Sequence, residues 1–300
     1  MCVTTTNKMV FMYDTKDGKM LVKAKLTKKV LSVTFAGDFV LVGDKYGNVY
    51  VLKGNDDLEL LLGHTASPIM CMLHDSVNGL LLTGDREEKI RVSRFPKTAI
   101  IERFCFGHKS AITAMCSMSD NNMVSSSSDG SIIIWNHIQG RIVQRLSLEK
   151  DTFASKLSYS QSLRVLAALT NNKTLRLYFR TKSGEFKVFH TVNFSVEYLD
   201  VNFISKSVVL VVPLAPGVPR LYSVTRGGDN IIAFSDTISA LWRNVMQSWT
   251  NIDVTHVEQS VSGKVVTKRD LIDKTFQMEM KTKLERTIKR RKIDHETTTS

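Results

Sequence analysis

The feature of this sequence that most constrains its fold is a strand ending that recurs along the chain. Short apolar segments close on an aromatic residue, or on a residue in its place, and successive closing positions lie 39, 41, 42, 43 and 44 residues apart. Two Gly-His pairs, Gly63-His64 and Gly107-His108, are also 44 residues apart. Repetition at this period predicts an array of similar supersecondary units. The closing residues are Tyr13, Leu52, Ser93, Trp135, Tyr178 and Tyr222.

The period predicts an all-β fold, a WD-repeat beta-propeller, because about 40 to 45 residues make one blade of four antiparallel strands. The segments LVGDKYGNVYVL and MVSSSSDGSIIIW predict two strands joined by a tight turn, with Gly47 and Gly130 in the turns. The repeats stop near Trp249. We therefore expect a propeller over residues 1–250 and a C-terminal helix with a basic tail over residues 251–300.

The polar residues of the repeats are expected to be structural. In repeats of this type the His is a buried hydrogen-bonding partner of a turn acid, which predicts Asp129 as the partner of His108 and a similar role for His64. Trp135 closes the repeat nearest to the ideal ending. Neither the G-x-S-x-G elbow of hydrolases nor a Walker-type phosphate loop occurs in the sequence. The sequence thus predicts no catalytic residue, no cofactor or metal site and no small-molecule substrate.

The formal net charge of +12 is concentrated near the C-terminus. Residues 264–292 contain eleven Lys or Arg and four Asp or Glu, a local excess of +7. Such an excess suits a polyanionic partner, although a solvated tail is the simpler alternative. No apolar run reaches the roughly 18 residues that a membrane span needs, so we expect no contact with a membrane. The cysteines form no metal-binding pattern and are expected to be reduced thiols.

The tail itself has two parts. Apolar residues recur every fourth position from Ile272 to Ile288, which predicts a docking helix. That helix packs either on the chain's own propeller or partly on a partner. The run Lys289, Arg290, Arg291 and Lys292 follows, and it suits nuclear import or contact with phosphate.

The stretch LLTGDREEKIRVSRFP, residues 81–96, carries Lys89 and Arg91 in alternation with Ile90 and Val92. In a strand, this alternation places the two charges on one face and the two aliphatic side chains on the other. Only one face of the strand is then packed.

This stretch, with LLGH at 61–64 before it and FCFGHKSAITAM at 104–115 after it, resembles the WD-repeat non-catalytic subunit of eukaryotic tRNA (guanine-N7) methyltransferase. The resemblance extends from about Lys8 to Leu146, weakens beyond, and recovers in the tail. Its most specific part is DREEKIRVS, where Ser93 replaces the usual closing aromatic. Compared with the seven-bladed family pattern, the chain begins inside the second strand of the first blade, so that blade is expected to be incomplete.

The resemblance implies a nuclear scaffold that is not itself an enzyme. The side of the propeller would hold a separate catalytic subunit in a heterodimer, and that subunit binds S-adenosylmethionine and methylates N7 of a guanine in the tRNA variable loop. In the family, a basic residue of this strand forms an ion pair with acidic residues of the catalytic subunit. The matching position is Arg91, with Lys89 nearby, and the family's basic tail implies contact of residues 289–292 with tRNA.

Two other functions remain open from the sequence. A generic WD-repeat adaptor would recruit peptides or chromatin proteins through the central face of the propeller, whereas the scaffold would use the blade side near Arg91. An enzyme is the third alternative, and the sequence offers no paired acids or base–nucleophile set for it.

Overall fold

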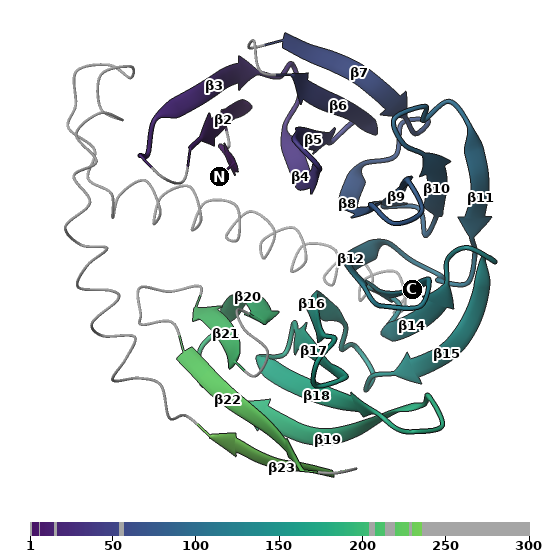
Figure 1. The fold of residues 1–300 in the computed structure, drawn as a ribbon, viewed down its shortest axis with the longest axis vertical. Coiled ribbons are helices and arrows are strands. Elements are labelled where there is room, and N and C mark those ends of the chain that lie inside the picture. The colour runs from purple at the N-terminus through teal and green to yellow at the C-terminus, as the bar shows by residue number, and fades with distance from the viewer. Residues whose placement is uncertain are drawn as a thin grey trace, which may run out of the picture.

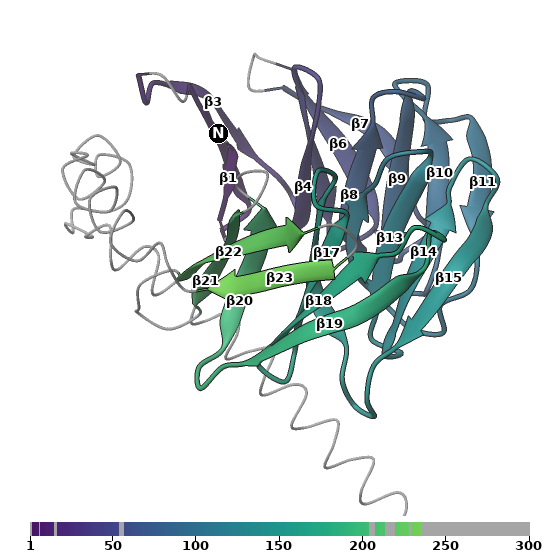
Figure 2. The same ribbon diagram turned by 60° about the horizontal axis from the view of Figure 1, so that its bottom comes forward.

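The computed structural model describes residues 2–5, 7–14, 17–53, 57–203, 208–213, 220–227 and 230–235. Within these ranges, twenty-three strands form six antiparallel sheets. Figure 1 shows the sheets arranged as blades around a common centre, and Figure 2 shows the same ring turned by 60°. The prediction of an all-β propeller is confirmed. The predicted boundary at residue 250, the C-terminal helix and the basic tail lie outside the described residues.

The sheets follow one another in chain order. The first sheet has three strands, β1 (Cys2–Thr4), β2 (Met9–Tyr13) and β3 (Met20–Lys25). The second consists of β4 (Val30–Ala36), β5 (Phe39–Asp44), β6 (Asn48–Lys53) and β7 (Asp57–Gly63). The third consists of β8 (Ile69–Asp75), β9 (Leu80–Asp85), β10 (Ile90–Arg94) and β11 (Ile101–Cys105).

The remaining three sheets repeat this four-stranded order. The fourth consists of β12 (Ile112–Ser117), β13 (Asn122–Ser127), β14 (Ser131–Asn136) and β15 (Arg141–Ser147). The fifth consists of β16 (Ala154–Ser160), β17 (Val165–Thr170), β18 (Thr174–Arg180) and β19 (Phe186–Asn193). The sixth consists of β20 (Tyr198–Phe203), β21 (Val208–Pro213), β22 (Arg220–Gly227) and β23 (Asn230–Ser235).

The first strand of each four-stranded sheet lies innermost in the ring, and β4, β8, β12, β16 and β20 contact one another in that order. The second strands β9, β13 and β17 are buried along their whole length. They are buried because both faces of each sheet are covered by its neighbours, so apart from Asp85 and Asn122 at two strand ends their residues are apolar or carry small hydroxyl side chains. The outer strand β15, in contrast, is mostly exposed.

All six closing residues of the sequence repeat fall in the strand next to the outermost strand of their sheet. Trp135 on β14 is fully buried and packs in one cluster with Ile90 and Val92 of β10. The closing aromatic therefore fills the space between two neighbouring blades, which is why the repeat period and the blade period coincide.

The predicted tight turns are also confirmed. Gly47 lies between β5 and β6 with φ +96°, and Gly130 lies between β13 and β14 with φ +83°. At Gly47 a Cβ atom would lie 2.5 Å from the carbonyl oxygen of His64 and 2.7 Å from that of Ser67. Both the left-handed backbone and the close approach of another chain segment require glycine here.

Candidate partner interface on the third sheet

His108 lies in a buried chain of hydrogen bonds within the fourth sheet. Its Nε2 is 2.7 Å from Oγ of Ser125, and the indole Nε1 of Trp135 donates to the same oxygen at 2.7 Å. On the other side, Nδ1 of His108 is 2.9 Å from Oγ of Ser131, which donates to Oδ1 of Asp129 at 2.6 Å. The five side chains tie β13, β14 and the loop before β12 together.

The direction of these bonds follows from the indole N–H, which can only donate. Ser125 accepts from Trp135 and gives its own proton to Nε2, so the proton of the neutral ring sits on Nδ1 and points to Ser131. Burial lowers the pKa of His108 to about 4, although the carboxylate of Asp129 acts in the opposite direction. Asp129 Oδ2 lies 3.5 Å from Nδ1, so Ser131, which the sequence did not single out, links the ring to the predicted acid.

His64 has a related but different environment in the third sheet. Its Nδ1 is 3.1 Å from Oδ2 of Asp85, and its Nε2 is 2.7 Å from Oγ1 of the buried Thr83. The other oxygen of Asp85 accepts from the backbone amides of Glu87 and Lys89 at 2.9 and 3.0 Å. Burial raises the pKa of Asp85, but these hydrogen bonds outweigh burial and the pKa is lowered. Asp85 therefore fixes the turn that leads into β10.

Arg91 occupies the seam between the second and third sheets. Its Nε donates to Oγ of Ser93 at 2.9 Å. Ser93 is the closing residue of the third sheet, the position that Trp135 occupies in the fourth. Its Nη1 donates to the carbonyl of Gly63 on β7 at 3.1 Å, and its Nη2 donates to the carbonyl of Thr98 in the β10–β11 loop at 2.8 Å. The half-buried side chain is thereby held in one position.

The charge of Arg91 is not balanced by an acid among the described residues. All three acceptors are neutral oxygens, and three of the five N–H groups of a guanidinium are used, so two remain. Arg176 on β18 stands at the equivalent position, two residues before a closing residue, and it forms an ion pair with Glu149. In the described ranges, then, Arg176 has its own carboxylate and Arg91 has none.

Lys89 lies just before β10, and its side chain is 44% exposed. Its Nζ is 3.3 Å from Oε2 of Glu87, and both side chains are largely open to water. Such exposed pairs contribute little to stability, roughly 0 to 1 kcal/mol, so Lys89 is available to exchange Glu87 for another partner. The four tail residues Lys289, Arg290, Arg291 and Lys292 lie outside the described residues.

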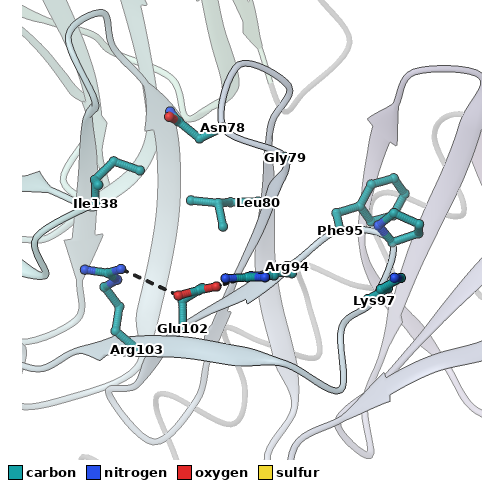
Figure 3. A pocket seen from close by; sticks show the side chains of 10 residues that line it. Asn78, Gly79, Leu80, Arg94, Phe95, Lys97, Glu102, Arg103 and Ile138 are labelled. Atoms are coloured by element: carbon teal, nitrogen blue, oxygen red, sulfur yellow. Dashed lines mark hydrogen bonds and ion pairs between the residues drawn. The ribbon is translucent and has the colours of Figure 1, made fainter.

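A hollow of roughly 590 Å³ lies beside the β10–β11 loop, and Figure 3 shows its lining. Three of its four charged side chains are grouped together, because Glu102 bonds Arg94 and lies 3.8 Å from Nη2 of Arg103, and Lys97 is the fourth. Neither Lys89 nor Arg91 lines it. Among the described residues, no cluster of His, Cys, Asp or Glu could hold a metal ion, and no helix could span a membrane.

The chain can now be compared with known proteins. Residues 54–275 match the family described as the tRNA methyltransferase TRM82 WD40 domain. The chain belongs to this family. The match includes residues that lie in or contact the third and fourth sheets, namely His64, Lys89, Arg91, His108 and Trp135.

Relatives with the family's name match a smaller part of the chain. The non-catalytic subunit trm82 of tRNA (guanine-N(7)-)-methyltransferase from Aspergillus oryzae is 31% identical over 51% of this chain and 35% of that protein. TRM82 from Vanderwaltozyma polyspora is 32% identical over 41% of the chain and 30% of that protein. The subunit wuho from Drosophila yakuba is 31% identical over 47% and 35%. The matched segments span about a third of these relatives.

Solved structures support the fold alone. A chain of the mitotic checkpoint complex matches with a TM-score of 0.65 at 16% identity, covering 79% of this chain and 74% of that chain. The computationally designed Ika8 protein matches with a TM-score of 0.57 at 17% identity, covering 78% and 70%.

Proposed function

We propose that this chain is the non-catalytic scaffold subunit of a tRNA guanine-N7 methyltransferase. In this role it would stabilise the catalytic subunit and help to position tRNA for formation of 7-methylguanosine in the variable loop. The catalytic subunit would bind the methyl donor, and this chain would bind no cofactor. Family membership and the names of the relatives support the proposal.

The observation that carries the proposal is the state of Arg91. A cation that is half buried, held by three neutral acceptors and without a carboxylate partner among the described residues suits an acidic side chain from outside. Because the guanidinium is already ordered, little conformational entropy is lost when a carboxylate binds to its two remaining N–H groups. Removing one partner from such a buried pair typically costs about 2 to 5 kcal/mol of binding free energy.

The test is a pull-down from nuclear extract with the wild-type chain and Arg91→Glu, followed by an assay for guanine-N7 methylation of tRNA in the bound fraction. We expect the wild type to retain methyltransferase activity and Arg91→Glu to lose it. Lys187→Glu makes the same charge change on the outer strand β19, where Lys187 is exposed, and should retain the activity. Circular dichroism must show that all three proteins are folded. Absence of activity with the folded wild type would contradict the proposal.

We further propose that the basic run from Lys289 to Lys292 directs the chain to the nucleus and contacts the tRNA backbone within the complex. Contacts of Lys and Arg with phosphate are insensitive to sequence and weaken with salt. Alanine at all four positions should lower nuclear accumulation and tRNA affinity at low salt, while binding of the catalytic subunit is retained. Unchanged localisation and unchanged tRNA affinity would refute both roles of the tail.

A further inference from the structure

Beside Arg91, the outer strand of the third sheet exposes large apolar side chains. Ile101 is 43% exposed, Phe104 is 36% exposed and Phe106 is 63% exposed. The rings of Phe104 and Phe106 are stacked, with centroids 5.5 Å apart and an interplanar angle of 20°. Outer strands in sheets are usually protected by charged or polar residues, so an exposed aromatic pair at this edge requires an explanation.

The strand register places these residues on the same face as the guanidinium. Arg91 on β10 is directly opposite Phe104 on β11, and Ser93 is opposite Ile101. Side chains that face each other across antiparallel strands lie on one side of the sheet. Cys105, between the two Phe residues, is fully buried on the other side. The Phe side chains therefore belong to the solvent-facing surface around Arg91.

The neighbouring fourth sheet faces the other side of β11, where Cys105 packs in one cluster with Trp135. A Cβ atom at Gly107 would lie 2.9 Å from Cδ1 of Ile142 on β15, and Ile142 is itself an exposed residue. Arg145, also on β15, donates to the carbonyl of Gly107 at 2.7 Å. Like Arg91, Arg145 has no carboxylate within ion-pair distance in the part of the chain that the structure describes. Ile142 and Arg145 therefore belong to the next seam, and we call the surface formed by Arg91, Ile101, Phe104 and Phe106 the Phe–Arg patch.

We propose that the Phe–Arg patch binds a segment of the catalytic subunit in which a large apolar side chain lies beside a carboxylate. This inference rests on the proposed function and specifies the chemistry of the partner. The apolar side chain packs on the stacked rings of Phe104 and Phe106, and the carboxylate binds the two remaining N–H groups of Arg91. The arrangement fits the usual anatomy of an interface, where a few aromatic and arginine side chains contribute most of the binding free energy.

Charge complementarity selects an acidic segment over other occupants. Arg91 lies beside the aromatic pair with no carboxylate partner among the described residues, and the nearby acid Glu102 already bonds Arg94. A basic or purely apolar segment would leave the guanidinium group of Arg91 partly desolvated without a carboxylate, which costs binding free energy. An acidic segment satisfies the charge and covers the rings at the same time.

The test is a titration of the purified catalytic subunit with the full chain and its variants. Phe106→Ala and Phe104→Ala should each lower the affinity at least tenfold, since truncated hot-spot side chains typically cost more than about 1.4 kcal/mol, or tenfold. Val188→Ala, which truncates an exposed apolar residue on β19, is the matched control and should leave the affinity within twofold. Phe106 is the more exposed of the two rings, so its truncation is the variant least able to disturb the fold.

Arg91→Ala, measured in the same titration, separates the two proposals. Loss of affinity with Arg91→Ala and with both Phe variants supports the Phe–Arg patch. Loss with Arg91→Ala alone overturns the patch and leaves the proposed scaffold function standing. Unchanged affinity with all three variants overturns the patch and also the location of the interface on this side of the propeller.

Discussion

Ser125→Ala removes the oxygen at the centre of the buried chain that links Trp135 to His108. Two groups then lose their partner, the indole N–H of Trp135 and Nε2 of His108, and both side chains are buried. A buried polar group without a hydrogen bond costs about 1 to 3 kcal/mol, so the two together should lower the free energy of unfolding by about 2 to 6 kcal/mol. That loss is a large part of the 5 to 15 kcal/mol that typically stabilises a domain.

The assay is urea denaturation followed by circular dichroism, with the unfolding slope compared between variants so that a change of midpoint can be interpreted as a change of stability. Ser119→Ala is the control, because the Ser119 hydroxyl bonds only the exposed carboxylate of Asp120 and its loss should change stability by less than about 0.5 kcal/mol. In a double-mutant cycle, Trp135→Phe removes the stranded N–H, so the double variant should be more stable than the sum of the two losses predicts. A Ser125→Ala loss below about 1 kcal/mol, or strictly additive losses, would refute this reasoning.

Two further predictions concern stability. Gly47→Ala should destabilise the fold by more than about 3 kcal/mol, because its Cβ would meet two backbone carbonyls. Gly37→Ala is the control and should cost only about 1 kcal/mol, because Gly37 has φ +62° and open space around it. Equal losses for the two variants in thermal unfolding would contradict the clash at Gly47. The pKa of His108 is about 4 in the fold, below its ordinary value, so between pH 6.5 and pH 4 the unfolded chain binds more protons at this histidine than the folded chain. The free energy of unfolding should therefore fall by about 3 kcal/mol over this range. The contribution of His108 to stability is complete above pH 6.5 and is lost as the pH falls. His108→Gln should flatten the dependence of the unfolding free energy on pH. An unchanged slope in that variant would refute the assignment of this dependence to His108.

Most of the fold could be predicted from the repeat, because the closing residue of each blade must fill the gap to the neighbouring sheet. Trp135 shows the reason: it is buried between two blades, and its spacing from Ser93 and Tyr178 is the spacing of the blades themselves. Gly47 and Gly130 were predictable for the same kind of reason, since only a few residues tolerate a positive φ.

The surroundings of Arg91 could be predicted only in part. Alternation with Ile90 and Val92 indicated its face, but two of its three acceptors are backbone carbonyls, at Gly63 and Thr98, and every residue carries such a group. Asp85 was missed for a different reason. Three acids, Asp85, Glu87 and Glu88, lie within four residues of the sequence, which does not distinguish them, whereas the structure uses Asp85 to bond His64 and the turn amides.

The Phe–Arg patch was beyond sequence reasoning because its members come from separate strands. Phe104 and Phe106 lie on either side of the buried Cys105 at the end of β11, so the sequence alone marks them only as one face of this segment. Their position opposite Arg91 depends on the register between β10 and β11, which includes a bulge after Val92. Register and bulges are set by tertiary packing, which a single strand does not encode.

The measurement that tests the central claim most directly is the dissociation constant of the catalytic subunit for three proteins: the wild-type chain, Arg91→Ala and Arg176→Ala. The two arginines occupy equivalent positions in their blades, but Arg176 is paired with Glu149 inside the chain. We expect Arg91→Ala to weaken binding roughly 30-fold or more, the equivalent of at least about 2 kcal/mol, and Arg176→Ala to leave it unchanged. Equal affinities for all three folded proteins would contradict the claim that Arg91 anchors the catalytic subunit to this scaffold.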